Sequence, residues 1–154
     1  MCTVDLKKLT PIQALPAIGD AEEAAELEAL HRDAAAYLRS FHWCPELRQA
    51  YLGEGVPGIF ASFLFELKAP IPGTEDDCLW VVVGDLPSAY FVVDDAPTPR
   101  AALEVYCELM DDWIGAVREG TSLEEVYPVA AEPTEEHAAM LASRLTFLRE
   151  EIIR

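Results

Sequence analysis

The chain is poor in basic residues, and this scarcity limits the partners that it can have. Its 154 residues include 11 lysines and arginines against 28 aspartates and glutamates, which gives a formal net charge of −17 at pH 7. A field of that sign repels nucleic-acid phosphates and anionic lipid headgroups. We therefore expect no nucleic-acid partner and no membrane association. The charge would attract a basic protein to the surface, and the alternative interpretation is that it serves only solubility.

Long apolar runs and paired cysteines are also missing. The longest apolar run, IFASFLF at residues 59–65, is far shorter than the roughly 20 residues of a membrane-spanning helix. The opening residues MCTVDLKKL lack the apolar segment of a secretory signal, so we do not expect export by that route. No C-x-x-C spacing occurs, which favours free thiols in a reducing cytoplasm. The scattered cysteines are Cys2, Cys44, Cys78 and Cys107.

The chain lacks the sequence signatures of nucleotide, metal and hydrolase sites. It contains no G-x-x-x-x-G-K-[ST], no G-x-G-x-x-G and no G-x-S-x-G. His31 and His137 stand alone on expected helices, and His42 with Cys44 would need a third ligand brought by the fold. None of the acidic pairs lies in a calcium-binding loop pattern. These pairs are Asp76–Asp77, Asp94–Asp95 and Asp111–Asp112. We expect no metal ion and no cofactor.

The apolar content supports one folded domain over residues 1–154. Hydrophobic residues make up 51% of the chain, which is enough to build a core without disulfide bonds or a structural metal ion. Residues 1–19 read as an extended lead-in, because TPIQALPAIG holds two prolines and a glycine. Asp20 and Glu23 then form the D-x-x-E pattern of a capping box, which predicts a helix. Its apolar stripe consists of Leu27, Leu30, Ala34, Tyr37, Leu38 and Phe41.

The middle of the chain is predicted to form a short helix followed by three strands. Pro45 favours a first helical position, and Gly53 and Gly55 would end that helix. Residues 59–68 alternate as a strand with one apolar and one mixed face. LWVVV and AYFVV, at residues 79–83 and 89–93, read as central strands covered on both sides. Only five residues join them, so they must form an antiparallel hairpin.

The second half of the chain is predicted to be helical. Thr98 caps and Pro99 begins a helix that Gly120 ends, with an apolar stripe from Leu103 to Val117. A short helix is expected from Thr121 or Ser122 to Pro128. A last helix starts after Thr134 and turns Leu141, Leu145, Leu148 and Ile152 inward. This order predicts an α+β fold: an antiparallel sheet of three or more strands packed against and covered by helices. Trp43, Trp80 and Trp113 are expected in the core.

Two short segments hold the candidate catalytic residues. In GDLPSAY, Asp85 could project from a strand end as an acid, with Ser88 and Tyr90 nearby, but the same residues suit a turn. In HWCPE, Cys44 and His42 supply a thiol and a base. Residues two apart do not face each other on a helix, and free cysteines are commonly buried. The pattern therefore favours a turn for the first segment and assigns no catalytic residue to either.

One helix face is a candidate partner-binding surface. Glu104, Glu108 and Asp111 recur at helical spacing, with Asp112 beside them. Like charges at this spacing repel, and a basic partner would relieve that repulsion and associate faster. The alternative interpretation is an ordinary solvated helix face.

One stretch resembles a group of uncharacterised bacterial proteins. Its pattern runs L-K-x-P, then W-V-[IV]-x-G-D-L-P-x-x-Y, then P-R-x-A and a later tryptophan. The matching positions span residues 67–113: Leu67 to Pro70, Trp80 to Pro87, Tyr90, Pro99, Arg100, Ala102 and Trp113. The resemblance implies a bacterial cytosolic protein with a hairpin followed by a helix, and it implies no activity.

Three functional hypotheses follow from the sequence. The first is a non-enzymatic protein-binding module, of the kind that immunity proteins represent, whose acidic surface meets a basic partner. The second is a small thiol- or carboxylate-dependent enzyme around His42 and Cys44, with Asp85 as a further candidate. The third is a structural homo-oligomer that uses its apolar strands or helix faces as an interface.

Overall fold

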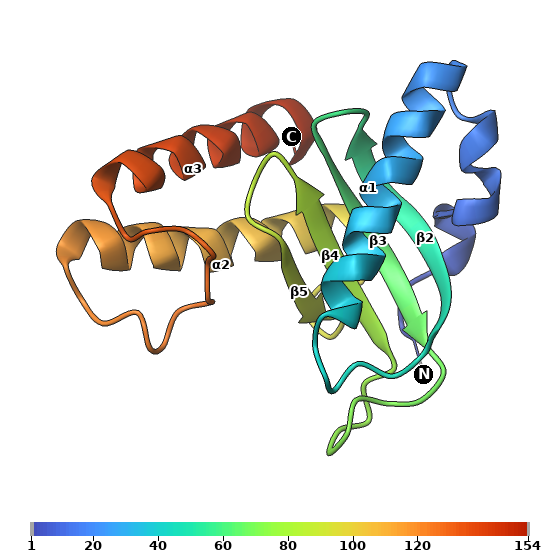
Figure 1. Cartoon of the computed structure of the whole chain (residues 1–154), viewed down its shortest axis with the longest axis horizontal. Coiled ribbons are helices and arrows are strands. Elements are labelled where there is room, and N and C mark those ends of the chain that lie inside the picture. The colour runs from blue at the N-terminus through green and yellow to red at the C-terminus, as the bar shows by residue number, and fades with distance from the viewer. Residues whose placement is uncertain (1, 154) are drawn as a thin grey trace. The chain divides into compact units, whose positions relative to one another are not determined.

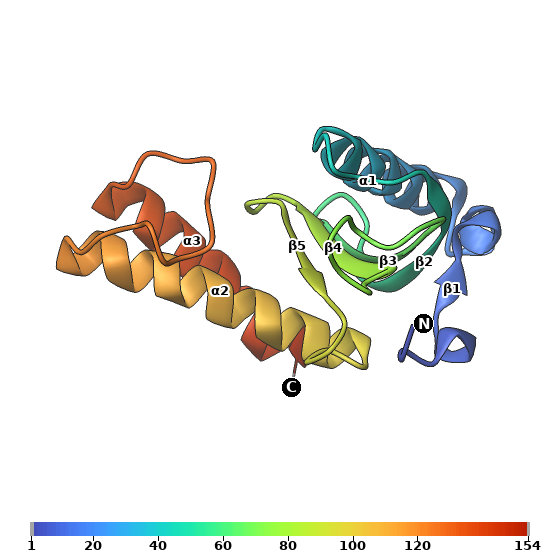
Figure 2. The same ribbon diagram turned by 90° about the horizontal axis from the view of Figure 1, so that it is seen from below.

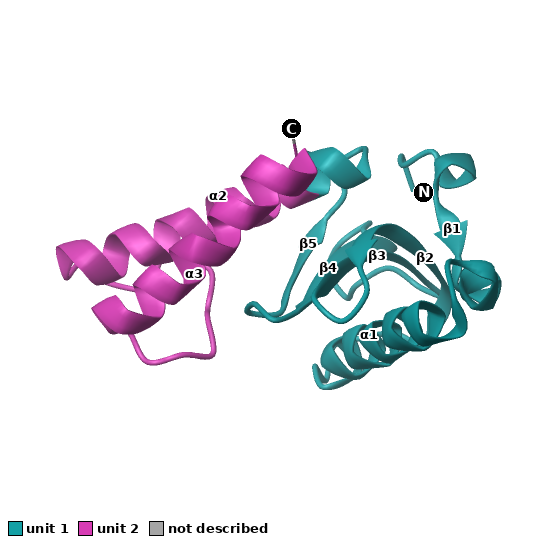
Figure 3. Ribbon diagram, turned by 90° about the horizontal axis from the view of Figure 1, so that it is seen from above, with its two compact units in different colours: residues 1–102 teal, residues 103–154 magenta. Residues whose placement is uncertain are grey.

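A computed structural model of the chain describes residues 2–153, which fall into two compact units, residues 1–102 and residues 103–154 (Figure 3). The expectation of a single domain over residues 1–154 stays a prediction. No helix in the described range is both long enough and apolar enough to span a membrane.

The first unit is built on a five-stranded sheet in which every neighbouring pair is antiparallel (Figure 1). The strands follow one another in sequence order, and the connection from β1 to β2 contains two helices, whereas the later strands are joined by shorter loops. They are β1 (Thr10–Pro11), β2 (Leu47–Val56), β3 (Phe60–Leu67), β4 (Cys78–Gly84) and β5 (Ala89–Val92). Together with the helices, this sheet confirms the predicted α+β fold.

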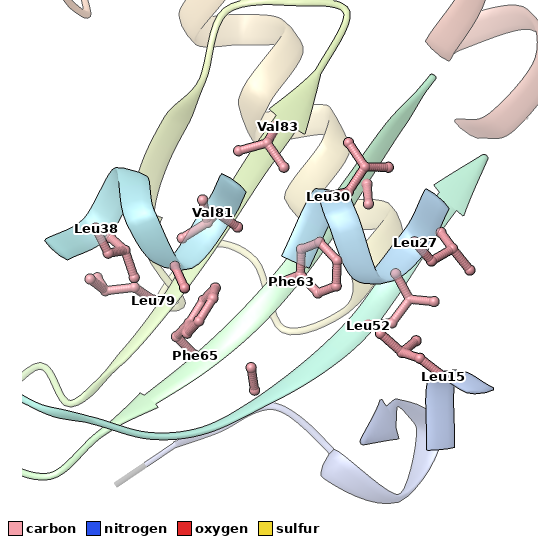
Figure 4. Close-up of a cluster of buried hydrophobic side chains, with 14 of the residues drawn as sticks. Leu15, Leu27, Leu30, Leu38, Leu52, Phe63, Phe65, Leu79, Val81 and Val83 are labelled. Carbon is pink, nitrogen blue, oxygen red and sulfur yellow. The ribbon is translucent and has the colours of Figure 1, made fainter. Parts of the chain in front are cut away.

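Helix α1 (Ala21–Arg39) lies across one face of the sheet (Figure 2). The predicted capping box is present: Asp20 Oδ1 accepts from the Glu23 N–H at 2.8 Å, and Glu23 Oε1 accepts from the Asp20 N–H at 3.4 Å. Four residues of the predicted stripe, Leu27, Leu30, Ala34 and Leu38, meet Phe63 and Phe65 of β3 in the core, and Tyr37 packs against it (Figure 4). Phe41, the last residue of the predicted stripe, lies beyond the end of α1. This core forms because the odd-numbered residues of β3 share one face.

The predicted hairpin is confirmed, with Leu79 opposite Val92 and Val82 opposite Ala89. Strand β4 is buried on both faces, as expected for a central strand. Strand β5 is not central: it pairs with β4 alone, and Val92 is 37% exposed. An apolar run of residues therefore indicated strand content correctly but not strand position.

The predicted short helix after Pro45 is wrong, because residues 47–56 form β2. Ala50 and Leu52 are buried with the strand period of two, which a helix could not maintain. Gly53 allows close packing and does not end a helix: a Cβ there would lie 2.9 Å from Trp80 Cζ3 and 2.8 Å from Ser62 Oγ. A bulge interrupts β2 at this point, and Ser62 Oγ accepts from the Glu54 N–H at 2.9 Å.

The lead-in is more structured than predicted. It contains the 3₁₀ helices η1 (Leu6–Lys8) and η2 (Ile12–Ala17) on either side of β1. Buried side chains, including Leu15 at 1% exposure, anchor the segment, which composition alone did not indicate. Gln13 and Gln49 also exchange two side-chain hydrogen bonds, of 3.2 and 3.0 Å, along the β2 edge.

Helix α2 (Pro99–Glu119) begins in the first unit and continues into the second. Thr98 Oγ1 accepts from the Ala101 N–H, which confirms the predicted cap. The second unit adds α3 (Glu135–Phe147), capped by Thr134 as predicted. The ion pairs Arg118–Glu135, at the start of α3, and Arg149–Asp111, just after its end, show that α3 runs back along α2. Trp80 and Trp113 are buried as expected, and Trp43 is half-buried.

Two predictions about the second unit are wrong. Residues 121–127 form turns, not a helix, and Ser122 Oγ accepts from the Glu124 N–H. At the end of the chain, α3 continues as the π-helical segment η3 (Leu148–Ile153). A π-helical turn holds more residues than an α-helical one. The inward position therefore falls on Ile153, at 8% exposure, and not on Ile152.

Candidate functional site

The candidate thiol, Cys44, is poorly suited to nucleophilic catalysis. His42 is exposed in the turn after α1, and Cys44 follows it on the way into β2. The Cys44 thiol donates a hydrogen bond to the Pro45 carbonyl at 3.2 Å. Burial raises the pKa of this thiol, although the nearby Arg39 opposes the rise. A raised pKa leaves little thiolate at neutral pH, and the thiolate is the reactive form.

The GDLP segment is explained by a close approach of two backbones. Gly84 has φ +135°, and a Cβ there would lie 2.3 Å from the Ile59 carbonyl oxygen and 2.5 Å from Phe60 Cα. The next residue, Asp85, donates its backbone N–H to the same Ile59 carbonyl at 2.7 Å. Only glycine fits this position, so Gly84 and Asp85 serve the sheet here.

The two candidate segments meet through their aromatic residues. Trp43 and Tyr90 lie with ring centroids 5.1 Å apart, and Phe41 contacts both, at 5.4 and 5.1 Å. Tyr37 completes this cluster of half-buried rings. Such ring pairs contribute about 0.5–1.5 kcal/mol each beyond their burial. The cluster gives Tyr90 a packing role at the place where a catalytic centre had been considered.

The predicted acidic face on α2 already has one internal cation. All four residues, Glu104, Glu108, Asp111 and Asp112, are exposed. Arg149 of η3 donates two hydrogen bonds to the Asp111 carboxylate. This pairing raises the pKa of Arg149 and relieves part of the repulsion that a basic partner was expected to relieve.

An acid-lined hollow lies at the end of this face. Its volume is about 670 Å³, and all of its lining comes from the second unit. Five carboxylates contribute to the wall. The lining residues are Asp111, Asp112, Gly115, Ala116, Glu119, Thr121, Ser122, Glu124, Glu125 and Val126. Asp111 and Asp112 belong to the predicted face, whereas Glu104 and Glu108 do not line the hollow. Glu119 at the end of α2 was missed, and Glu124 and Glu125 were missed because residues 121–127 were expected to be helical.

The first unit carries a second hollow with the opposite charge. This cleft, about 410 Å³ in volume, is bordered by η2, α1 and β2, with Phe65 of β3 in its wall. The lining residues are Ile12, Gln13, His31, Arg32, Ala35, Ala36, Arg39, Leu47, Arg48, Gln49, Ala50 and Phe65. Sequence reasoning missed this cleft. The seven-residue spacing of Arg32 and Arg39 was the available signal, but Arg48 joins them only through the fold.

Neither hollow is lined by His42, Cys44 or Asp85. Within residues 2–153, no three histidine, cysteine or acidic side chains are grouped so that they could hold a metal ion. His137 instead helps to cap α3, with Nδ1 2.9 Å from Thr134 Oγ1 and 3.1 Å from the Glu132 carbonyl oxygen.

The most acidic thiol is Cys2, which sequence analysis had not singled out. A hydrogen bond with Cys78 lowers the pKa of Cys2 to about 7. The same contact, with burial, raises the pKa of Cys78. Burial raises the pKa of Cys107 to about 11, so this thiol stays protonated at neutral pH.

Comparisons with known proteins do not assign the chain to a family. No protein-family model, no curated protein and no solved structure matches the chain. The resemblance to uncharacterised bacterial proteins therefore stays a prediction.

Proposed function

We propose that this protein is a non-enzymatic binding module that takes up a basic segment of a partner protein in the acidic hollow of residues 103–154. The observation that carries the proposal is how few of the five carboxylates in the hollow are paired with a cation. Asp111 is paired with Arg149. Among residues 2–153, no cation forms an ion pair with Asp112, Glu119, Glu124 or Glu125. Four neighbouring negative charges thus lack a counter-charge of their own.

The hollow suits arginine or lysine side chains by shape as well as by charge. Gly115 and Ala116 are the small residues in the part of its wall that α2 forms, and their size leaves room between the acidic residues. An arginine guanidinium can bind a carboxylate through two parallel hydrogen bonds, which sets its orientation. Complementary charge also speeds encounter, and the net charge of −17 adds to that effect at long range.

The thiol-enzyme hypothesis has less support. Cys44 has a raised pKa, and neither hollow is lined by the residues that this hypothesis needs. The homo-oligomer hypothesis stays a prediction, and light scattering at micromolar concentration tests it directly. A monomer under those conditions would exclude it.

The binding proposal is tested with an arginine-rich peptide of defined sequence, titrated into the whole chain by calorimetry. One variant carries Asp112→Asn, Glu119→Gln, Glu124→Gln and Glu125→Gln. The matched control removes the same number of charges from exposed acids of the first unit. Its changes are Glu22→Gln, Glu75→Gln, Asp94→Asn and Asp95→Asn.

We expect the hollow variant to lose at least tenfold in affinity and the control to lose less than threefold. An equal loss in both would show that the peptide senses only net charge, and the proposed site would then be wrong. Circular dichroism of each variant checks that the helices are retained. Amide shifts on titration of the unmodified chain show independently whether the peptide contacts residues 111–126.

A further inference from the structure

The cleft of the first unit is cationic in a strongly anionic protein. Arg32, Arg39 and Arg48 line it, so three of the 11 basic residues of the chain gather around one hollow. No aspartate or glutamate is among its lining residues. This cleft is therefore positively charged although the net charge of the chain is negative.

Among the residues that the structure describes, the three arginines of the cleft make no ion pair with an acidic residue. Within residues 2–153, Arg32, Arg39 and Arg48 make no ion pair, whereas Lys68, Arg118 and Arg149 each do. A chain with 28 acidic residues offers many possible partners. Three guanidinium groups that line one cleft without an acidic partner leave bidentate donors available to an anion from outside.

One side of the cleft is aromatic and apolar. The His31 ring stacks on Phe65 with centroids 5.8 Å apart and an interplanar angle of 14°, and it meets Phe63 edge-on at 5.6 Å. Burial lowers the pKa of His31, and the charges of Arg39 and Arg32 lower it further. The ring therefore stays neutral near pH 7 and offers a flat face beside the guanidinium groups.

Small side chains create the space. Arg32 and Arg39 stand seven residues apart on α1, which corresponds to about 10 Å along the helix axis. Ala35 and Ala36 lie between them and fill little of that distance. Arg48 comes from β2, and the paired amides of Gln13 and Gln49 lie at the sheet edge. A volume of about 410 Å³ is in the range of small-molecule sites.

We propose that this cleft binds a small organic anion, whose carboxylate or phosphate group is held by the arginines and whose apolar body packs on His31 and on the partly buried Ile12 and Leu47. This site is separate from the acidic hollow, and it does not depend on the proposed protein-binding function. A nucleic acid is a poor candidate because the charge of the whole chain repels a polyanion. A compact anion presents far less charge to that field.

The test uses aromatic probes that differ only in their polar group. 2-Naphthyl phosphate and 2-naphthoate distinguish a phosphate from a carboxylate ligand, 2-naphthylmethanol removes the charge, and inorganic phosphate removes the ring. Calorimetry with the whole chain measures affinity, and amide shifts locate the site. We expect saturable submillimolar binding of at least one naphthyl anion, and binding at least tenfold weaker for the alcohol and for inorganic phosphate.

Two kinds of variant separate charge from shape. Arg39→Gln with Arg48→Gln removes two guanidinium groups, and Lys7→Gln with Lys8→Gln is the control with the same change in net charge on exposed residues. We expect the arginine variant to bind the anion at least tenfold more weakly and the lysine variant to bind it within twofold. Ala36→Leu fills the cleft without changing charge or disfavouring the helix, and it should also weaken binding tenfold.

Several results would overturn the proposal. One is the absence of saturable binding by either naphthyl anion, and another is an equal loss of affinity in the arginine and lysine variants. A third is self-association of the unmodified chain that Arg39→Gln with Arg48→Gln abolishes while no probe binds. That result would assign the cleft to an acidic segment of a second copy. Unchanged circular dichroism spectra confirm that each variant is folded.

Discussion

The two units of this chain present hollows of opposite charge, although both units are acidic. Residues 1–102 hold 7 basic and 16 acidic residues, and residues 103–154 hold 4 and 12. The second unit thus carries a net charge of −8 on about half as many residues as the −9 of the first. The hollow of the second unit is negatively charged, like the unit as a whole. The cleft of the first unit is positively charged, although that unit is also negative overall. Local charge is decided by which helix faces and strands meet, and composition does not report it.

The largest effect is expected from Gly84→Ala, which tests whether the two units fold separately. The new Cβ would lie 2.3 Å from the Ile59 carbonyl oxygen, and the residue would be held at φ +135°. We expect a loss of about 3 kcal/mol in the free energy of unfolding, measured by urea titration. Gly73→Ala is the control: its φ of +82° is unfavourable, but no atom lies within 4 Å, so about 1 kcal/mol is expected.

Amide hydrogen exchange in the Gly84→Ala variant compares the units directly. If residues 1–154 form one cooperative domain, protection falls in both units together. If the units are independent, only residues 1–102 lose protection. A cost no larger than that of Gly73→Ala would show that β3 and β4 do not approach as described.

A second comparison concerns thiol chemistry. The pKa of Cys2 in the first unit is about 7, and that of Cys107 in the second is about 11. We expect iodoacetamide to alkylate Cys2 at least a hundredfold faster than Cys107 at pH 7. Mass spectrometry measures the rate at each cysteine. The Cys2 rate should reach half its maximum near pH 7. A midpoint near that of an ordinary cysteine, about 8.5, would contradict the hydrogen bond from Cys78.

Binding at the two hollows should depend on salt to different degrees, because one relies on charge alone and the other also on apolar contact. Between 50 and 500 mM salt, binding of the arginine-rich peptide to the acidic hollow should weaken at least tenfold, because it depends on several exposed charges. Binding of a naphthyl anion to the cleft should weaken only about threefold, because its contacts with His31, Ile12 and Leu47 are not screened. Equal salt dependence would mean that the aromatic wall contributes nothing.

The pH dependence of stability should reveal His31. Its pKa lies below the usual 6.5, so the unfolded chain binds a proton more readily than the folded one. This difference lowers stability as pH falls below about 6.5. Burial is the main cause of the lowered pKa, and the charges of Arg39 and Arg32 of α1 lower it further, while Arg48 is the other charged residue that lines the cleft. His31→Phe should lose less stability than the unmodified chain between pH 7 and 5, as measured by urea titration.

The smallest effect is expected from Arg149→Gln. The Arg149–Asp111 pair is about half exposed, and such pairs contribute about 0–1 kcal/mol. The change should therefore alter stability by about 0.5 kcal/mol. It should also strengthen binding of the arginine-rich peptide two- to threefold, because Asp111 would lack its internal cation. Lys68→Gln, which breaks the similarly exposed Lys68–Glu46 pair of the first unit, is the control and should not change peptide binding.

The elements that sequence predicted well are those encoded by local contacts. The capping box of Asp20 and Glu23, the cap at Thr98 and the hairpin around Gly84 each depend on residues a few positions apart. Strand β2 was missed because Gly53 was interpreted as the end of a helix. Glycine ends helices, but here it makes room for Trp80, which is distant in sequence.

The candidate sites were harder to predict for the same reason. Asp111 and Asp112 were found because they share one helix with the rest of the acidic face. Glu124 reaches the hollow only through a turn that Ser122 closes, and Arg48 reaches the cleft only through the packing of β2 against α1. Sites assembled from separate elements depend on tertiary contacts that a pattern within one element does not contain.

The reciprocal amides of Gln13 and Gln49 have a consequence for the behaviour of the chain in concentrated solution. Strand β1 covers only two residues of β2, so the adjoining backbone would invite strand addition from a neighbouring molecule. Gln49 Oε1 occupies the Ala50 N–H at 2.9 Å, and Gln13 ties that amide in place. One backbone donor of this edge is thereby occupied by a side chain of the same molecule, which opposes strand addition at this position.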